Sequence, residues 1–576
     1  MDKFQEEIIK LLKIEKVNVE AVEKPKDSKL GDYAFPCFPL AKEFKKSPQQ
    51  IAEELASKIN KNIQKKKIKT IKEAVATGPF LNFFINKTSF SKKILTEVYK
   101  QKDKYGLGKE KKKVMVEFCS PNTNKPLHLG HVRNCVTGDA VAKILAFNGN
   151  KVTKANLVND RGVHICKSML AYQKFGKNKL PDIKPDFFVG KFYVKFAQEA
   201  AKSAKISEKL EKEAQLMLQK WEQGDKEVIK LWKRMNSWVY EGFGETYKAL
   251  GISFDKFYYE SEMYKEGKDV IMKGLKKNIF EKDDTGAVLA NLEKFKLPKK
   301  VLLRSDGTTV YITQDIFLAK KKFDDYKLDK SIYVVGSEQK MHFEVLFKIM
   351  GLLGYDNENM HHLSYGMVYL PEGKMKSREG KVVDADDLVR KMTELARFGI
   401  KERHKDLEEK EIDKRARMIG LGALKFYLLK IDFVKDMYYN PEESISFEGE
   451  TGPYVQYTHA RICSIMKKLK DVKIKIDDSL IKKIKYEVYD DKEQEIIKLL
   501  SEFPKIIKDA ASHLKPSLIT RYLLDLSQKV NEFYHASPIL KAPDDLLRAR
   551  IFLVHNSKQV IKNGLALLGI DAPEEM

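Results

Sequence analysis

Two histidines and a glycine stand where a helix is expected to begin, in the sequence His128-Leu129-Gly130-His131. A loop with two prolines precedes them, and apolar residues at helical spacing follow. The amino terminus of a helix presents N–H groups and the positive end of its dipole, so it favours phosphate. Both imidazoles can donate hydrogen bonds to phosphate oxygens, and Gly130 lets a flat base or a ribose approach the backbone. The alternative is that two surface histidines merely begin a helix.

A glycine-bounded segment with several lysines lies about 240 residues further along the chain. It reads Gly373-Lys374-Met375-Lys376-Ser377-Arg378-Glu379-Gly380 and follows residues 366–370. Glycines at both ends indicate a mobile loop, whose lysines can neutralise a triphosphate in a transition state. Considered alone, such a loop is more often solvated surface. Its place after the histidine pair is what favours a function.

Strand and helix patterns around the histidines indicate a parallel sheet. Residues 114–118 and 152–158 have the composition of buried strands, and residues 132–145 carry apolar side chains at helical spacing. A strand, a crossover helix and a second strand predict a parallel sheet that binds ligands at the carboxyl ends of its strands. Residues from about 165 to 265, which hold all three tryptophans, are interpreted as a helical insertion, and strand patterns return at 301–303 and 332–335.

The two ends of the chain have different patterns. Residues 1 to about 110 combine an apolar helical face, made by Phe4, Ile8, Leu11 and Leu12, with a turn and strand at 78–85. From about 390 to the end, charged amphipathic helices dominate. The sequence therefore predicts a small α+β unit, an interrupted α/β core and a helical carboxyl-terminal domain.

The composition favours an intracellular protein with a polyanionic partner. The 576 residues carry 107 Lys and Arg against 82 Asp and Glu, which gives a net charge of +25 and a pI near 9.3. This excess attracts nucleic acid, although runs such as Lys65-Lys66-Lys67 equally fit solvated surface. The apolar runs are too short to cross a membrane, and the amino terminus has no secretory signal. Five cysteines without a Cys-x-x-Cys pair indicate neither disulfides nor a zinc knuckle, which fits the cytoplasm.

Together the two segments resemble the His-Ile-Gly-His and Lys-Met-Ser-Lys-Ser signatures of class I aminoacyl-tRNA synthetases. Their neighbours narrow the resemblance to the arginyl-tRNA synthetases. These are Glu117-Phe118-Cys119-Ser120-Pro121-Asn122 with Lys125-Pro126, Gly31-Asp32-Tyr33-Ala34, Gly452-Pro453-Tyr454-Val455-Gln456-Tyr457 and the ending Ala572-Pro573-Glu574-Glu575-Met576. The resemblance covers essentially the whole chain.

The resemblance implies a fold and an activity. The expected fold is an α/β multidomain protein with a Rossmann-like parallel-sheet catalytic core at 111–390, interrupted by the helical insertion at about 165–265. An α+β domain at 1–110 would bind the tRNA elbow, and an all-α domain at 391–576 would bind the anticodon. The enzyme would activate L-arginine with ATP to arginyl-adenylate and pyrophosphate, then transfer the arginyl group to the terminal ribose of tRNA(Arg). Mg²⁺ would accompany the ATP without a tightly bound protein metal, tRNA would be required before arginine is activated, and a monomer is expected.

The resemblance also implies roles for single residues. The catalytic set is His128, His131, Lys125, Lys374 and Lys376; ATP contacts add Gly130, Gly336 and Glu338; arginine contacts are Ser120, Asn122, His131, Tyr311, Asp315 and Gln339; tRNA contacts are Phe80, Asn82, Tyr454, Tyr457, Arg461 and Met576.

Elementary chemistry supports part of this assignment. A planar, charged guanidinium needs a carboxylate placed for paired hydrogen bonds, and Tyr311 and Asp315 share one face if they are helical. Gln339 and Glu338 follow a strand, at the edge where such sheets bind ligands. The alternatives are that Asp315 caps a helix, that Tyr311 and Phe80 are core residues, and that the 336–339 segment is an ordinary turn.

The sequence departs from the family pattern at two places. The lysine loop has lysine third and serine fourth, where the signature has serine then lysine, so either Lys374 or Lys376 is left to reach the phosphates. The resemblance implies that Lys125 compensates. In Asn159-Asp160-Arg161-Gly162 an arginine stands where the family often has tryptophan. A synthetase for another amino acid and a non-catalytic RNA-binding paralogue are the alternatives. The cysteinyl enzyme is disfavoured because its zinc-binding cysteine spacing is absent, and the paralogue because both signatures are retained.

Overall fold

The structure, a computed structural model, describes residues 3–17, 19, 22–25, 27, 30–263, 266–369, 383–469 and 474–576. The chain divides into two compact units. Unit 1 comprises Met1–Tyr105, Ile462–Lys505 and Leu526–Val560, and unit 2 comprises Gly106–Arg461, Ile506–Asp525 and Ile561–Met576. Within the described ranges, every helix is too short or too polar to span a lipid bilayer.

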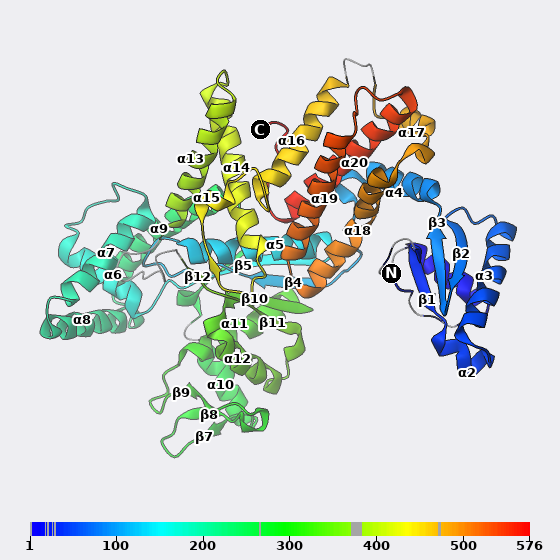
Figure 1. The fold of residues 1–576 in the computed structure, drawn as a ribbon. Coiled ribbons are helices and arrows are strands. Elements are labelled where there is room, and N and C mark those ends of the chain that lie inside the picture. Colours follow the sequence, from blue (N-terminus) through cyan, green and yellow to red (C-terminus); the bar gives the residue numbers. More distant parts are fainter. Residues whose placement is uncertain are drawn as a thin grey trace. The chain divides into compact units, whose positions relative to one another are not determined.

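Unit 1 begins with a three-stranded antiparallel sheet covered by helices (Figure 1). The elements are α1 (Lys3–Ile14), β1 (Tyr33–Pro36), α2 (Ala41–Phe44), α3 (Pro48–Lys65), β2 (Ile71–Thr77) and β3 (Phe80–Ile85), and the strand order is β1-β3-β2. Phe4, Ile8, Leu11 and Leu12 of α1 are buried, as the apolar face predicted. The turn between β2 and β3 contains Gly78 with a positive φ of 56°, which a glycine adopts without strain. The predicted α+β arrangement is therefore confirmed.

Long helices make up the carboxyl-terminal part of the chain, as predicted. They are α16 (Gly452–Lys468), α17 (Asp478–Lys483), α18 (Asp491–His513), α19 (Ser517–Ala536) and α20 (Asp544–Leu567), and α4 (Lys87–Gln101) also belongs to unit 1. Inside unit 1 a buried ion pair joins Arg550 Nε to Glu493 Oε1 at 2.7 Å. Tyr105 donates its hydroxyl to the carbonyl of Leu500 at 2.9 Å.

Unit 2 is built on a parallel sheet of five strands within the described residues. The strands are β4 (Lys113–Glu117), β5 (Lys151–Val158), β6 (Lys256–Tyr259), β10 (Lys330–Gly336) and β11 (Met360–Tyr365), in the order β11-β10-β4-β5-β6. Helix α5 (Leu129–Phe147) crosses from β4 to β5. The βαβ prediction is confirmed. The strand order reverses between β4 and β10, and such a reversal marks the ligand-binding crevice of open α/β sheets.

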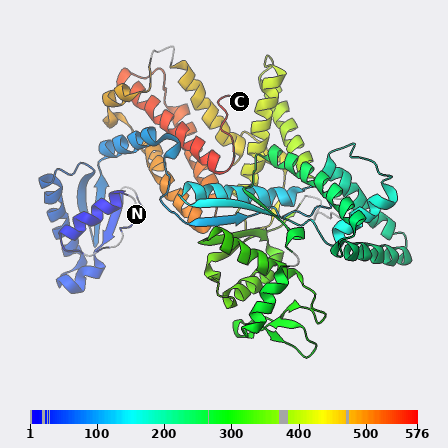
Figure 2. The same ribbon diagram turned by 180° about the vertical axis from the view of Figure 1, so that it is seen from behind.

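The insertion differs in one respect from the sequence prediction. Its helices are α6 (Val163–Phe175), α7 (Pro185–Ala200), α8 (Ala204–Glu222) and α9 (Lys226–Leu250), and Figure 2 shows them gathered at one end of the sheet. The prediction of an all-helical stretch to about 265 was wrong at its end, because β6 lies within it as an edge strand of the sheet. A strand of four residues is too short to show a clear period of two.

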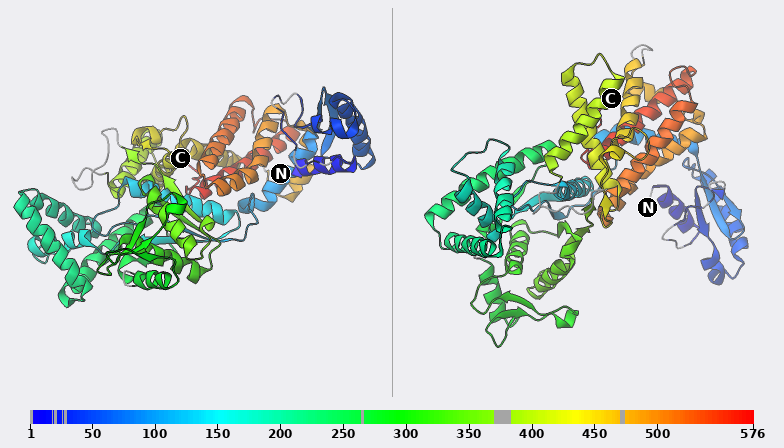
Figure 3. Two further views of the ribbon diagram at one scale, coloured as in Figure 1. Left: turned by 90° about the horizontal axis from the view of Figure 1, so that it is seen from below. Right: turned by 60° about the vertical axis from the view of Figure 1, so that its left-hand side comes forward.

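The remaining elements of unit 2 surround the sheet. A small antiparallel sheet contains β7 (Glu281–Lys282), β8 (Val288–Ala290) and β9 (Lys300–Leu303); the helices are α10 (Gly267–Lys276), α11 (Tyr311–Tyr326), α12 (Lys340–Leu352), α13 (Ala385–Arg403), α14 (Glu409–Lys430) and α15 (Pro441–Ser444); β12 (Val368–Tyr369) pairs in parallel with β13 (Met437–Tyr438). Helices α13 and α14 form a hairpin, which the right-hand view of Figure 3 shows in yellow-green.

A buried ion pair fixes α11 against the sheet. Lys322 of α11 bonds Glu117 at the end of β4, and both side chains are almost fully inaccessible. The lysine ammonium also lies 4.6 Å from the ring centroid of Tyr333 on β10. Burial works to lower the pKa of Lys322, yet attraction to Glu117 and Tyr333 leaves it above its ordinary value. The charged pair thus sets where α11 sits, two turns beyond Asp315.

Replacing Lys322 with methionine is expected to destabilise unit 2 by about 3–5 kcal/mol, because Glu117 is then left buried without its cation. The measurement is thermal unfolding of the full chain. The matched control is Lys320→Met, which breaks the exposed pair with Asp324 on the same helix and is expected to cost about 1 kcal/mol or less. Equal losses in the two variants would contradict a special role for the buried pair.

Candidate active site

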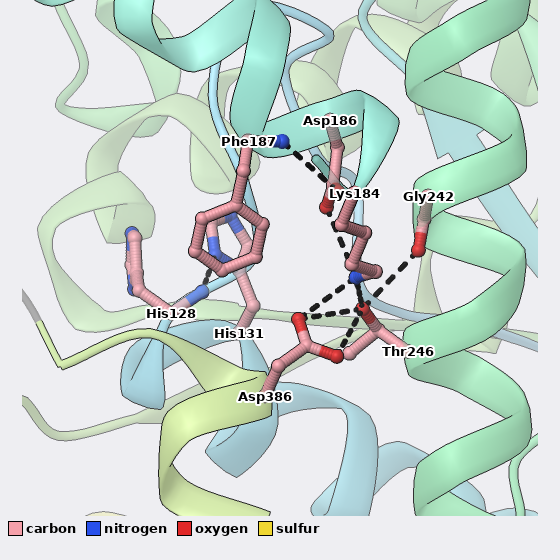
Figure 4. Close-up of polar contacts among 8 residues, drawn as sticks. All are labelled: His128, His131, Lys184, Asp186, Phe187, Gly242, Thr246 and Asp386. Atoms are coloured by element: carbon pink, nitrogen blue, oxygen red, sulfur yellow. Dashed lines mark hydrogen bonds and ion pairs between the residues drawn. The ribbon is translucent and has the colours of Figure 1, made fainter. Parts of the chain in front are cut away.

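The histidines at the start of α5 hold each other through the backbone. Gly130 donates its N–H to His128 Nδ1 at 3.2 Å, and His128 donates its N–H to His131 Nδ1 at 3.2 Å. The ring centroids lie 3.9 Å apart, and Figure 4 shows the two imidazoles side by side. Since each Nδ1 accepts a hydrogen bond, each Nε2 carries the proton in the neutral ring. The pair therefore presents two Nε2 donors at the amino terminus of a helix.

Both imidazoles are neutral at physiological pH. Burial, and then the positive charge of Lys125, lower the pKa of His128 to about 4. Burial, His128 and Lys125 lower the pKa of His131 well below its ordinary value. A neutral imidazole with its proton on Nε2 is a hydrogen-bond donor to phosphate, and the positive charge comes from Lys125 instead. The structure thus brings together His128, Gly130, His131 and Lys125 as the sequence grouped them.

The backbone that leaves β4 is strained. Cys119 and Ser120 have positive φ values of 79° and 49°, which cost about 1–3 kcal/mol each unless the surroundings enforce them. Asn134 Oδ1 accepts from the N–H of Cys119 at 2.6 Å, and Asn156 Oδ1 accepts from that of Ser120 at 3.1 Å. Asn122 follows in an isolated bridge with Asn159. Ser120 and Asn122 are therefore held at the carboxyl end of β4, beside the crevice.

The segments on both sides of residues 370–382 are fastened to α5. Arg133, fully buried, donates to the carbonyls of Gly366, Met367, Phe433 and Lys435 at 2.6 to 3.2 Å. On the other side, Leu129 donates to the carbonyl of Val383 at 3.0 Å, and Ala385 donates to that of Leu127 at 2.9 Å. Lys374 and Lys376 lie outside the described residues.

Asp315 and Gln339 come from neighbouring elements. Asp315 lies near the start of α11, and His342 of α12 contacts its carboxylate with 2.8 Å between Nε2 and Oδ2. Gln339 immediately precedes α12, and Gly336 and Glu338 belong to the same turn after β10. Tyr311 is the first residue of α11, and it is 77% exposed. The alternative in which Tyr311 packs in a core is therefore wrong.

Sequence reasoning missed a second carboxylate beside Asp315. With the Gln314 amide oriented by its partners, Nε2 donates to Glu260 Oε1 at 2.7 Å and Oε1 accepts from Arg161 Nη1 at 3.0 Å. Burial raises the pKa of Glu260 to about 7, Arg161 works to lower it, and Asp160 and Asp315 raise it. The only signal for Arg161 was the departure from the family pattern, and Glu260 had none.

Asp160 ties the insertion to this carboxylate. Its Oδ1 accepts from the N–H of Ser261 at 2.8 Å, and its Oδ2 accepts from the hydroxyls of Ser261 and Tyr240 at 2.6 and 2.9 Å. Its carbonyl accepts from Trp232 Nε1 at 2.7 Å. Burial raises the pKa of Asp160, against these hydrogen bonds. Helix α9 and the turn that carries Glu260 are thus positioned by one side chain.

A lysine network joins the insertion to α13 beside the histidines (Figure 4). Lys184 Nζ lies 2.5 Å from Thr246 Oγ1, 2.8 Å from Asp386 Oδ2 and 3.3 Å from Asp186 Oδ2. A Cβ on Gly242 would lie 2.3 Å from Asp186 Oδ1, so α9 can approach α7 this closely only with glycine there.

A cavity of about 590 Å³ opens between α7 and the histidine turn. Its lining includes Lys125 and His128 from the turn, Asp384 from the start of α13, and aromatic and lysine side chains of α7. Burial and the neighbouring Asp387, Asp386 and Asp186 raise the pKa of Asp384 to about 6, against the effect of Lys184.

Comparisons with known proteins agree with this geometry. A family model for the catalytic domain of class I (R) tRNA synthetases matches residues 94–440, an arginyl-tRNA synthetase N-terminal domain matches 1–85, and a DALR anticodon-binding domain matches 455–576. The arginine–tRNA ligase of Treponema denticola is 46% identical over 572 residues, covering 98% of this chain and 95% of that protein. The chain belongs to the arginyl-tRNA synthetase family. The resemblance and the ligase class predicted from the sequence are confirmed.

Further comparisons support membership. The arginine–tRNA ligase of Bacteroides thetaiotaomicron is 44% identical over 581 residues, covering 96% of this chain and 95% of that protein. The solved arginyl-tRNA synthetase of Thermus thermophilus superposes with a TM-score of 0.82 at 28% identity, covering 100% of this chain and 99% of that one. The predicted Rossmann-like core with a helical carboxyl-terminal domain is confirmed.

The residues predicted to contact tRNA differ in accessibility in this synthetase. In unit 1, Phe80 is 38% exposed and forms an edge-to-face pair with Phe38, which is 54% exposed, at 5.8 Å between centroids. The alternative in which Phe80 is a core residue is therefore wrong. Asn82 on the same strand is 2% exposed. Phe38 was missed because the two rings come from distant parts of the sequence.

In unit 2 the predicted anticodon face is partly aromatic. The guanidinium of Arg461 lies 4.7 Å from the ring centroid of Tyr457 and donates to its hydroxyl at 3.2 Å. Tyr454 lies one turn earlier on α16 and is half-buried. The terminal Met576 packs against apolar residues of α13 and α14, and its carbonyl lies 2.9 Å from His404 Nε2.

Replacing Gly130 with alanine is expected to slow arginyl-adenylate formation by about tenfold or more, because the new Cβ would lie 3.0 Å from His128 Cε1 and turn its imidazole. The assay is tRNA-dependent ATP–pyrophosphate exchange. Gly244→Ala on α9 is the control, since a Cβ there meets nothing within 4 Å, and its rate should match that of the wild type. A normal rate for Gly130→Ala would show that the histidine turn tolerates displacement.

Proposed function

We propose that unit 2 performs both steps of arginine–tRNA ligation at the crevice between β4 and β10. The arginine carboxylate attacks the α-phosphorus of ATP, which gives arginyl-adenylate and pyrophosphate. A hydroxyl of the terminal ribose of tRNA(Arg) then attacks the arginyl carbonyl and AMP leaves. Such chemistry needs positioning and charge neutralisation rather than a strong base. The observation that carries the proposal is the pair of neutral histidines with Nε2 donors at the start of α5, beside Lys125.

The nucleotide is held by the histidine turn and by the turn after β10. His128 and His131 donate to phosphate oxygens, and Gly130 leaves room for the nucleotide. Lys125, with Lys374 or Lys376, neutralises the charge that develops on the phosphates. Gly336 lets the ribose approach the backbone, and Glu338 accepts from its hydroxyls.

Substrate arginine is held at its two ends by different elements. Asp315 and Glu260 accept hydrogen bonds from the guanidinium, because a planar cation with five donors suits two carboxylates. Gln339 and Tyr311 complete this end of the site. Ser120, Asn122 and His131 hold the end that reacts.

Mg²⁺ accompanies the ATP phosphates in this proposal, and it supplies positive charge there when bound. Among the described residues, no group of three or more His, Cys, Asp or Glu side chains is arranged to hold a metal ion. The phosphate site offers nitrogen donors and a lysine, which suit the anion itself. We propose that Mg²⁺ binds through the nucleotide phosphates, as this ion commonly does in proteins.

The tRNA is bound by both ends of the chain. Residues 1–110 bind the elbow through Phe80 and Asn82, residues 391–576 bind the anticodon through Tyr454, Tyr457, Arg461 and Met576, and residues 111–390 carry the catalytic site. The net charge of +25 favours this polyanion over a large area. We further propose a cytoplasmic monomer that needs its tRNA before it activates arginine.

Asp315→Asn is expected to weaken arginine binding by about 100-fold or more, because the guanidinium loses an ionised partner, while ATP affinity changes less than about threefold. Arginine and ATP affinities are measured by calorimetry, and the arginine KM by pyrophosphate exchange. Asp324→Asn, on the exposed end of the same helix, is the matched control. Unchanged arginine affinity in Asp315→Asn would refute the pocket assignment. Exchange with another amino acid in place of arginine would refute the proposed substrate.

Phe38→Ala and Phe80→Ala are each expected to weaken tRNA(Arg) binding by about 1–3 kcal/mol, because a stacked base loses its aromatic partner. The measurement is a filter-binding titration at fixed salt. Val75→Ala on the neighbouring strand is the control, since Val75 is equally exposed at 38% but not aromatic. Wild-type affinity in both phenylalanine variants would place the elbow contact elsewhere.

A further inference from the structure

Arg161 lies where three elements of unit 2 meet. It follows β5, and its side chain is only 10% exposed. One guanidinium nitrogen, Nη2, bonds Glu222 Oε1 of α8 at 2.5 Å, and the other, Nη1, donates to Gln314 Oε1 of α11 at 3.0 Å. The guanidinium carbon lies 5.4 Å from the ring centroid of Trp221. Two hydrogen-bonded neighbours and an aromatic face fix the position of this cation.

The contact with Gln314 leads directly to the arginine site. Gln314 passes the interaction on, because its Nε2 donates to Glu260 Oε1 at 2.7 Å. Gln314 also precedes Asp315 in α11, so its backbone and that of Asp315 move together. Hydrogen bonds therefore connect Arg161 through Gln314 to Glu260, one of the two carboxylates proposed to bind the guanidinium.

We propose that Arg161 is a positioning residue of the arginine site, which holds Gln314 and Glu260 so that the Glu260 carboxylate faces the guanidinium of substrate arginine. This inference rests on the proposed function. Arg161 acts through its neighbours and does not touch the substrate.

The electrostatics of Glu260 give this role a measurable consequence. Burial raises the pKa of Glu260 to about 7, and the charge of Arg161 opposes that rise. Only the ionised carboxylate accepts paired hydrogen bonds from a guanidinium, so arginine affinity should increase as the pH rises through 7. Removing the cation should move this transition to a higher pH.

Other titratable groups surround Glu260 and can contribute to the pH dependence of arginine binding. They are Asp160 after β5, Asp315 on α11, Tyr259 and Glu262 beside Glu260 itself, Tyr240 of α9 through Asp160, and His342 of α12 through Asp315. His342 is the one imidazole in this set and contacts Asp315, so a variant without it provides a second background in which to test Arg161.

Calorimetric titration of the full-length enzyme with L-arginine from pH 6 to 9 tests the proposal. For the wild type, affinity should rise about tenfold between pH 6 and pH 8, with a midpoint near 7. For Arg161→Gln the midpoint should move up by about one pH unit, since an adjacent charge shifts a pKa by about that much or more. Its affinity should be about five- to tenfold weaker at pH 7 and recover to within about threefold of the wild type at pH 9.

Three further variants make the result specific. Arg161→Lys keeps the charge but cannot bond Glu222 and Gln314 with two nitrogens, so its midpoint should match the wild type while its affinity is a few-fold weaker. Glu211→Gln breaks a different ion pair of α8, the one with Lys167, and leaves Arg161, Gln314 and Glu260 untouched, so its affinity and midpoint should equal those of the wild type. In His342→Gln, adding Arg161→Gln should still shift the midpoint.

Two outcomes would overturn the inference. One is a wild-type pH profile for Arg161→Gln, and the other is a loss of affinity that is equal at every pH, which indicates a merely structural role. A wild type that binds no arginine, with or without tRNA(Arg), would instead refute the proposed function.

Discussion

The site depends on two consecutive buried side chains of α5, Arg133 and Asn134. Asn134 accepts from the N–H of Cys119 and donates to the carbonyl of Val334 on β10 at 2.8 Å. The guanidinium of Arg133 donates hydrogen bonds to backbone carbonyls in the two segments that lead into β12 and β13. Burying a cation costs free energy unless hydrogen bonds compensate for its lost hydration. Without the Arg133 side chain, those buried carbonyls would have no hydrogen-bond donor. Helix α5 also begins with the histidine turn. The same helix therefore positions the two histidines, the ends of β4 and β10, and the segments on both sides of residues 370–382.

Helix α11 plays the corresponding part for Asp315, the residue proposed to bind the guanidinium. Its far end is fixed by the buried pair of Lys322 and Glu117, and its near end by the contact of Gln314 with Glu260. Asp315 lies between these anchors, so its carboxylate is positioned from both directions. The acceptor Glu117 ends β4, the same strand whose next residues enter the strained turn of Cys119 and Ser120. Strand β4 therefore helps to position both α11, through Glu117, and the turn that holds Ser120.

The sequence predicted those parts of the site that are local. The histidine turn needs only four residues and the helix they begin, and the flanking strands show their own apolar runs. Glu260 was missed because it follows β6, a strand of only four residues, and because its contact is with a helix about fifty residues later in the chain. Asn82 was predicted to contact tRNA, yet it is buried between Leu81 and Phe83 on β3, the central strand of its sheet. Burial and contacts between distant residues depend on tertiary structure, which a local sequence pattern does not determine.

The charges of this enzyme pose a problem that its geometry answers. A chain with a net charge of +25 must attract tRNA yet also admit a cationic amino acid. Screening limits exposed charges to about 10 Å at ordinary ionic strength, so the surface excess steers tRNA without dominating a buried site. Within the site, Glu260 and Asp315 supply negative charge on the α11 side. The histidines on the α5 side stay neutral because burial lowers their pKa, and Lys125 adds positive charge there. Protonated histidines would repel the arginine that must approach the same phosphate, so their burial at the helix start serves both substrates at once.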